Sequence, residues 1–146
     1  MFKHILVAVD FAHSSDRALD VAAQMASESG AQLTLVAAYA VPALGYAAAE
    51  VVATDLVTPS EDAARAQMNE LVAEIRKRCP RVDAYVRQGR PAEGVLATTR
   101  EVGADLIVIG THARHGVERL VLGSVAESVL RDSPVPVLVV RSTPTP

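Results

Sequence analysis

The sequence predicts an α/β fold in which a mostly parallel sheet is covered by helices on both faces. Five short apolar runs alternate with four segments of helical periodicity along the 146 residues. Strands that alternate with helices require crossover connections, and such connections give parallel pairing. Because most of these runs are apolar almost throughout, they are typical of strands buried on both faces. One domain is expected over residues 1–142, followed by a short Pro-rich tail at 143–146.

The first strand and helix are expected near the start of the chain. Residues 5–9 form an apolar, β-branched run that predicts a buried strand. Ser14 and Ser15 are expected to cap the next helix, and Asp16 lies in its first turn, where the helix dipole favours an acid. Gly30 is expected to end this helix.

A second strand and a second helix follow. The strand is expected over residues 33–39, and the alanine-rich segment 40–57 after it has no clear period. Thr58 is expected to cap the helix, Pro59 suits its first position, and Glu61 can complete a capping box. The buried face of this helix is predicted from apolar residues at helical spacing: Ala64, Met68, Leu71, Val72 and Ile75.

The second half of the chain continues the alternation. Residues 82–87 alternate apolar and polar side chains and predict a third strand. Pro91 suits the first position of the next helix. Residues 106–109 predict a fourth strand, 125–131 a short last helix and 137–140 a fifth strand.

Composition excludes several classes of function. The chain has a net charge of -3, scattered basic residues and only 3% aromatic residues, which argues against a nucleic-acid partner. The single cysteine, Cys79, rules out a disulfide within the chain and favours a reducing compartment. Met1 leads almost directly into a strand-like run, so a cytoplasmic location is expected. No membrane partner is expected, because Pro42 and Gly45 interrupt the apolar stretch 33–49.

A glycine-containing segment after the fourth strand is the main candidate for ligand binding. Gly110 ends the strand, and Gly123 and Ser124 open the last helix. Glycine lets a backbone approach a ligand closely, and a helix N-terminus offers free amides and a positive dipole end. Together they favour a phosphate site. A second interpretation remains open, in which Ser124 only caps its helix in a capping box with Glu127.

Asp10, directly after the first strand, is the second candidate. Open parallel sheets bind ligands beyond the carboxyl ends of their strands, where the strand order reverses. If the first and fourth strands are neighbours, Asp10 and Gly110 share one crevice. An acid there can hold a ribose hydroxyl or a metal, or it can be only a turn former. A zinc site is not indicated, because His112 and His115 lie in a loop without a cysteine partner.

Several segments resemble the universal stress protein family, in order and over nearly the whole chain. The segments that carry the resemblance are 5–10 with Ser14 and Ser15, 88–92, 104–112, 122–129 and 136–140. The resemblance implies a Rossmann-like three-layer sandwich. Its five-stranded parallel sheet would have the order 3-2-1-4-5, with four helices, and many members of the family are homodimers.

The same resemblance bears on nucleotide binding. The members that bind ATP share a glycine, two residues, a second glycine, nine residues, and then Gly-Ser or Gly-Thr. Gly110 and Gly123-Ser124 match this frame, whereas Ala113 stands at the middle glycine. Alanine keeps the backbone amide, and a left-handed conformation there would cost about 1–2 kcal/mol. Such a cost weakens binding without abolishing it. Binding of ATP, AMP or ADP is therefore expected, with Mg²⁺ as a companion of the phosphates.

The site implied by the resemblance has two groups of residues. The nucleoside group follows the first strand and lies late in the second: Val9, Asp10, Phe11 and Ala38. The phosphate group follows the fourth strand and opens the last helix: Gly110, His112, Ala113, Gly123, Ser124, Val125 and Ala126. In this arrangement Asp10 lies near the ribose or near a metal on the phosphates, and Ser124 donates its hydroxyl.

Three functions follow from these observations. The first is an adenine-nucleotide-binding regulator of stress responses that acts through nucleotide-dependent interaction with a protein partner. Little turnover is expected from it, because no activated nucleophile appears in the crevice. The second is a slow ATPase or a self-phosphorylating enzyme that uses Ser124 with help from Asp10 or His112. The third is a nucleotide-free dimeric interaction module, favoured if Ala113 blocks phosphate.

The last strand carries an expectation about assembly. It should lie at the sheet edge, which suits Pro134 and Pro136. Residues Val137 to Val140 are apolar and unguarded until Arg141. An exposed apolar edge is a liability unless something covers it. A symmetric homodimer through this strand is therefore expected.

Overall fold

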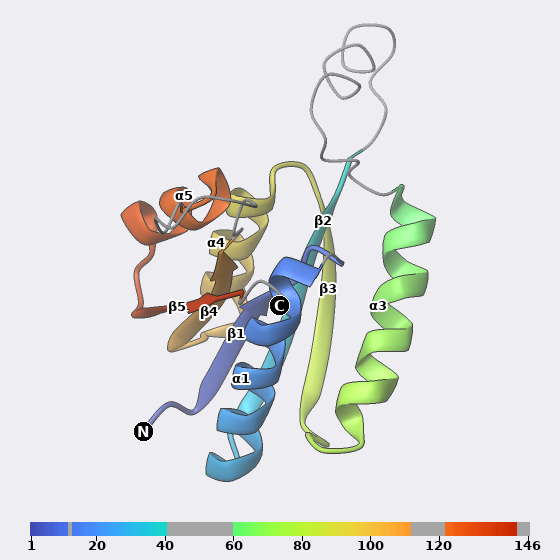
Figure 1. Ribbon diagram of the computed structural model, residues 1–146, viewed down its shortest axis with the longest axis vertical. Helices are drawn as coiled ribbons and strands as arrows, with labels where there is room; N and C mark the ends of the chain where they lie inside the picture. Colours follow the sequence, from blue (N-terminus) through green and yellow to red (C-terminus); the bar gives the residue numbers. More distant parts are fainter. Residues whose placement is uncertain (12, 41–59, 112–121, 143–146) are drawn as a thin grey trace, which may run out of the picture.

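The computed structural model describes residues 1–11, 13–40, 60–111 and 122–142 (Figure 1). The predicted Pro-rich tail and most of the segment 40–57 lie outside the described residues. The elements, in chain order, are β1 (His4–Ala8), α1 (His13–Ser29), β2 (Gln32–Tyr39), α3 (Glu61–Arg76), β3 (Val82–Gln88), α4 (Pro91–Val102), β4 (Leu106–Thr111), α5 (Ser124–Asp132) and β5 (Val137–Arg141). Each predicted strand lies within two residues of its observed bounds.

The five strands form one parallel sheet in the order β3-β2-β1-β4-β5, which confirms the predicted fold class. Helices α1 and α3 pack on one face, and α4 and α5 pack on the other (Figure 1). The result is a three-layer α/β sandwich with β1 at its centre. In the described part of the chain, no helix is both long enough and apolar enough to cross a membrane.

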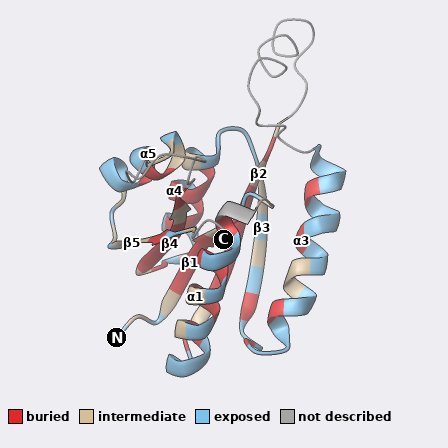
Figure 2. Cartoon of the chain, in the orientation of Figure 1, coloured by how far each residue is buried: buried red, intermediate tan, exposed pale blue. Residues whose placement is uncertain are grey.

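Two hydrophobic cores flank the sheet, and β1 contributes to both. Ile5 and Val7 pack into the core beneath α1 and α3, and Leu6 packs into the core beneath α4 and α5. All three are at most 1% exposed, and Figure 2 shows the buried residues concentrated along the central strands. Full burial of such a side chain stabilises the fold by about 1.5–3 kcal/mol. Aliphatic packing on both faces therefore fixes the position of β1.

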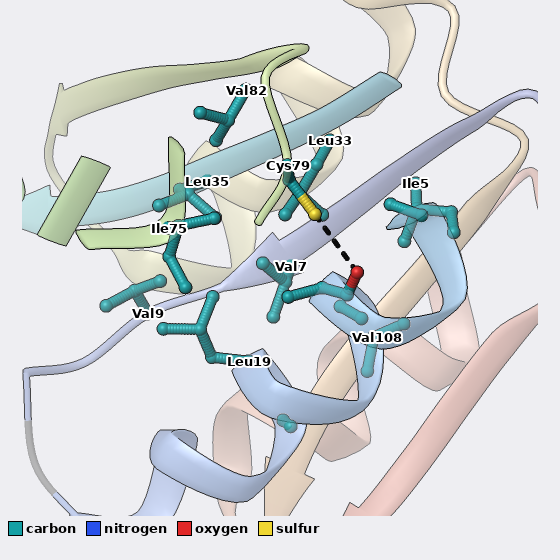
Figure 3. Packing of buried hydrophobic residues seen from close by; sticks show 14 of the residues in the cluster. Ile5, Val7, Val9, Leu19, Leu33, Leu35, Ile75, Cys79, Val82 and Val108 are labelled. Carbon is teal, nitrogen blue, oxygen red and sulfur yellow. Dashed lines mark hydrogen bonds between the residues drawn. The ribbon is translucent and has the colours of Figure 1, made fainter. Parts of the chain in front are cut away.

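Cys79 joins the end of α3 to α1. Its thiol is buried and donates a hydrogen bond to the backbone carbonyl of Ala23, with 3.0 Å between the sulfur and the oxygen (Figure 3). Ile75 and Leu33 lie close by in the same core. Burial raises the pKa of the Cys79 thiol, although the nearby Arg78 opposes this shift. The cysteine is therefore a packing residue rather than a reactive thiolate.

The predicted cap of α1 is wrong. The helix begins at His13, so Ser14 and Ser15 lie inside its first turn. Ser15 is buried, and its hydroxyl accepts a hydrogen bond from the Asp10 amide at 3.4 Å. The serine thus braces the preceding loop, a tertiary role that local capping preferences do not reveal.

The predicted start of α3 is also wrong. The helix begins at Glu61 with Ser60 as its cap, later than a start at Pro59 would require. The Ser60 hydroxyl accepts a hydrogen bond from the Ala63 amide at 3.3 Å, which satisfies one amide of the first turn. Thr58 and Pro59 lie outside the described residues.

A polar cluster fastens β1 to the end of the sheet opposite the strand carboxyl ends. The Asp105 carboxylate accepts hydrogen bonds from the Lys3 amide at 2.9 Å and the His4 amide at 3.0 Å. Burial opposes ionisation of Asp105, but these bonds outweigh it and lower its pKa. The His4 ring nitrogen Nε2 lies 2.6 Å from the buried Thr34 hydroxyl. Burial lowers the pKa of His4, although Asp105 and Asp83 oppose the shift.

The lowered pKa of His4 predicts a pH-dependent stability. The folded protein binds this proton less readily than the unfolded chain, whose His4 titrates near its ordinary value of 6.5. The contribution of neutral His4 to the free energy of unfolding is therefore complete above pH 6.5. It is lost as the pH falls from 6.5 toward the lower pKa that His4 has in the folded protein. Urea unfolding between about pH 5 and about pH 8 should show stability rising with pH, and His4→Gln should flatten part of that rise. An unchanged pH slope in His4→Gln would contradict this role.

Candidate functional site

The carboxyl ends of β1 and β4 meet, as the crevice hypothesis requires. These strands are paired up to Val7 and Val108, and extending that register by two residues brings Val9 level with Gly110. The Val9 amide also donates to the Val36 carbonyl of β2 at 2.8 Å. Because β1 pairs with β2 on one side and β4 on the other, the strand order reverses here. This is the position at which open parallel sheets bind ligands.

Ala38 joins this group from β2. Ala8 pairs with Val36, so extending the register brings Asp10 level with Ala38. Asp10 is exposed and Ala38 is half-buried. The structure thus brings together one carboxylate, one strand backbone and the Gly110 end of β4 at a single edge of the sheet.

Phe11 has the least ordinary backbone in the described part of the chain. Its φ is 60°, and it is the one residue other than glycine there with a positive φ. A bulky side chain in this left-handed region is strained by about 1–3 kcal/mol, and such strain is common at functional sites. The turn at Phe11 carries the chain from β1 into α1 and leaves Asp10 at the sheet edge.

The start of α5 has no side-chain cap among the described residues. Gly123 occupies the cap position in an extended conformation, with φ at -65° and ψ at 161°. The first helical hydrogen bond runs from the Glu127 amide to the Gly123 carbonyl at 3.0 Å. The amides of Ser124, Val125 and Ala126 come before this bond in the chain. Amides at these first positions of a helix have no acceptor within the helix.

The capping-box interpretation of Ser124 is therefore wrong. Ser124 is exposed and is the first helical residue, and Gly123 takes the cap position instead. Because α5 connects β4 to a parallel neighbour, it must run antiparallel to the strands and begin at their carboxyl edge. Its open amides thus lie on the same side of the molecule as Asp10 and Gly110.

His112 and Ala113, the remaining predicted phosphate residues, lie outside the described residues.

The carboxyl edge of the sheet also contains two residues that the sequence patterns did not indicate. Arg141 pairs with Thr111 at the end of the sheet, and the Ser142 hydroxyl donates to the Thr111 carbonyl. A lone arginine at a strand end carries no recognisable signal until the strand register is known.

A pocket of about 300 Å³ opens on the α1–α3 side of Val9 and Phe11. Its other lining residues are Asp16, Leu19, Gln67, Glu70, Leu71 and Glu74. Of the described residues, three carboxylates and no basic side chain line this pocket, so their charge disfavours phosphates there. The electrostatics favour the α5 side of the edge for an anionic group.

The described residues hold no group of three or more histidine, cysteine or acidic side chains that could bind a metal ion. Asp10 alone cannot form a metal site from protein ligands, because divalent cations take several oxygen ligands. The donor set fits only a metal that arrives with the phosphates and keeps most of its waters.

A family model described as the universal stress protein family matches residues 1–141. A curated relative from Thermus aquaticus, "Universal stress protein in QAH/OAS sulfhydrylase 3'region", is 37% identical over 97% of this chain and 100% of its own length. The UspA structure from Lactobacillus plantarum matches with a TM-score of 0.75 and 23% identity, over 95% of this chain and 97% of that one. A universal stress protein in complex with cAMP matches with a TM-score of 0.64 and 24% identity, over 97% and 98%.

The strain at Phe11 can be measured with two substitutions that remove the same ring. Phe11→Gly and Phe11→Ala lose nearly equal packing, but only glycine adopts a φ of 60° without strain. In urea unfolding, Phe11→Gly should be more stable than Phe11→Ala by about 1 kcal/mol. If residue 11 had an ordinary negative φ, the alanine variant would be the more stable one, because glycine gains more conformational freedom on unfolding. An alanine variant at least as stable as the glycine variant would refute the strained turn.

Proposed function

The chain belongs to the universal stress protein family, and we propose that it binds an adenine nucleotide and regulates stress responses. The observation that carries this proposal is the start of α5, which no side chain of the described residues caps, at the edge where β1 and β4 end. Helix starts of this kind bind phosphate through their free amides and dipole. The nucleotide is ATP, AMP or ADP.

The phosphates lie at Gly110 and at the amides of Ser124, Val125 and Ala126. Asp10 lies beside the ribose or binds Mg²⁺ through waters, and Ala38 presents its backbone to the adenine. The negative pocket between α1 and α3 supports this division, because it leaves the α5 side as the place for anionic groups. The cAMP bound to a protein of this fold supports the adenine part of the proposal.

The protein acts through nucleotide-dependent interaction with a partner protein rather than through turnover. Among the described residues of the crevice, the candidates for proton transfer or nucleophilic attack are Asp10 and the Ser124 hydroxyl. A serine needs an adjacent base to become a nucleophile. Ser124 is exposed at the start of its helix, which gives that hydroxyl no preorganised site. The single cysteine supports the proposal of a cytoplasmic location.

Nucleotide binding is tested by mass spectrometry of ligand retained through native purification, followed by calorimetric titration with ATP. The wild type should bind, and Gly123→Val should weaken binding at least about tenfold, because the side chain crowds the phosphate amides. Gly123 has an extended backbone that valine also adopts, so the variant should fold.

The matched control is Ala66→Val, which adds two of the same three side-chain carbons at an exposed position of α3 and should bind normally. No retained nucleotide and no heat at millimolar ATP would overturn the proposed function. Normal binding by Gly123→Val would show that the phosphates lie elsewhere.

We also propose a symmetric homodimer through β5. In the described sheet, β5 pairs with β4 alone, which leaves its outer edge open. Leu138 is 37% exposed on that strand, and Leu130 on the adjacent α5 is 40% exposed. Apolar side chains beside an open strand edge favour pairing with a second chain. A two-fold axis would cover both copies of the edge at once.

Light scattering at micromolar concentration should find the wild type as a dimer, and Leu138→Lys should shift it toward monomer. The lysine places like charges near the two-fold axis and protects the edge. Tyr85→Lys is the matched control, because Tyr85 is 36% exposed on β3 at the opposite edge of the sheet. A wild-type monomer, or equal dissociation of both variants, would reject the β5 interface.

A further inference from the structure

Arg141 lies at the edge of the sheet that the phosphates approach in the proposed function. It is the last residue of β5 and pairs with Thr111 in β4, one residue beyond Gly110. The Ser142 hydroxyl donates to the Thr111 carbonyl, which fixes the end of β5 to the end of β4. The backbone of Arg141 is therefore held beside the Gly110 end of β4.

The alternation of side chains along β5 sets the direction of Arg141. Val140 is 8% exposed and packs into the core beneath α1 and α3. Val137 and Val139 pack against the core beneath α4 and α5. Since alternate residues of a strand share a face, Arg141 leaves the sheet on the face that carries α5. This is the face on which Gly123 opens the helix, away from the acidic pocket.

Arg141 differs from several other arginines in its charge environment. Arg65, Arg78 and Arg87 form ion pairs with Glu61, Asp20 and Glu101, respectively. Arg141 is exposed, and no carboxylate of the described residues pairs with it. The Arg141 side chain and the start of α5 lie on the same face and at the same edge of the sheet, so together they provide a positive region for an anion.

Resting on the proposed function, we propose that Arg141 binds the outer phosphates of the nucleotide and thereby selects for phosphate number. The helix start supplies only about half an elementary charge, which is small against a triphosphate. The chain has no Gly-Lys-Ser/Thr motif to supply a lysine. A guanidinium offers full charge and paired donors that match phosphate oxygens. Arg141 is thus a specificity residue that acts on the ligand directly.

The test is calorimetric titration of adenosine, AMP and ATP into the full chain and three variants. Arg141→Gln should weaken ATP binding about tenfold, weaken AMP binding less, and leave adenosine unchanged, because only the outer phosphates contact the guanidinium. Arg141→Lys should recover most of the ATP affinity, since it restores the charge. Arg131→Gln is the matched control, because this exposed arginine lies in the last turn of α5 and its loss changes net charge equally.

The outcomes separate this inference from the proposed function. If wild-type protein binds ATP and Arg141→Gln binds it equally well, the role of Arg141 is overturned and the proposed function stands. Equal losses for adenosine and ATP would also overturn it, because they would indicate a structural effect. An equal loss of ATP affinity in Arg131→Gln would also overturn it, because net charge alone would then explain the effect. If the wild type binds no nucleotide, both proposals fail together.

Discussion

The pairing of β1 with a strand on each side is the constraint on which the rest of the structure depends. Ile5 and Val7 fill one core, and Leu6 fills the other, so β1 cannot move without opening both. At one end, Asp105 binds the backbone of Lys3 and His4. At the other end, the chain leaves the sheet at Asp10 between β2 and β4. A buried central strand thus determines where an exposed carboxylate lies.

Charge divides the carboxyl edge of the sheet into two sides. Toward α1 and α3, Asp16, Glu70 and Glu74 line an open pocket that disfavours anions. Toward α5, a helix start that no described side chain caps and the positive charge of Arg141 favour them. The two sides lie on opposite faces of one sheet, so the sheet itself separates the negative side from the positive side. Polar side chains at strand ends and helix starts can vary on such a scaffold without disturbing either core.

The sequence predicted what local pattern determines. Apolar β-branched runs located most of the strands, alternation of apolar and polar residues located the half-exposed β3, and helical spacing located the helices. Glycine spacing also led to Gly110 and Gly123, which the fold places at the carboxyl edge. The features that the sequence did not reveal depend on tertiary structure. Ser15 braces the Asp10 loop instead of capping, Phe11 takes a left-handed turn, and Arg141 gains meaning only from strand register.

If the β1–β4 edge and the start of α5 form one nucleotide site, as proposed, a bound nucleotide must perturb both of them together. The most direct test follows the backbone amide resonances of isotope-labelled protein during ATP titration. The largest shifts should occur at Asp10, at Gly110 and over residues 124–126, with little change around Glu70 and Glu74. Shifts confined to the acidic pocket, or no shifts at saturating ATP, would contradict a nucleotide site at this edge.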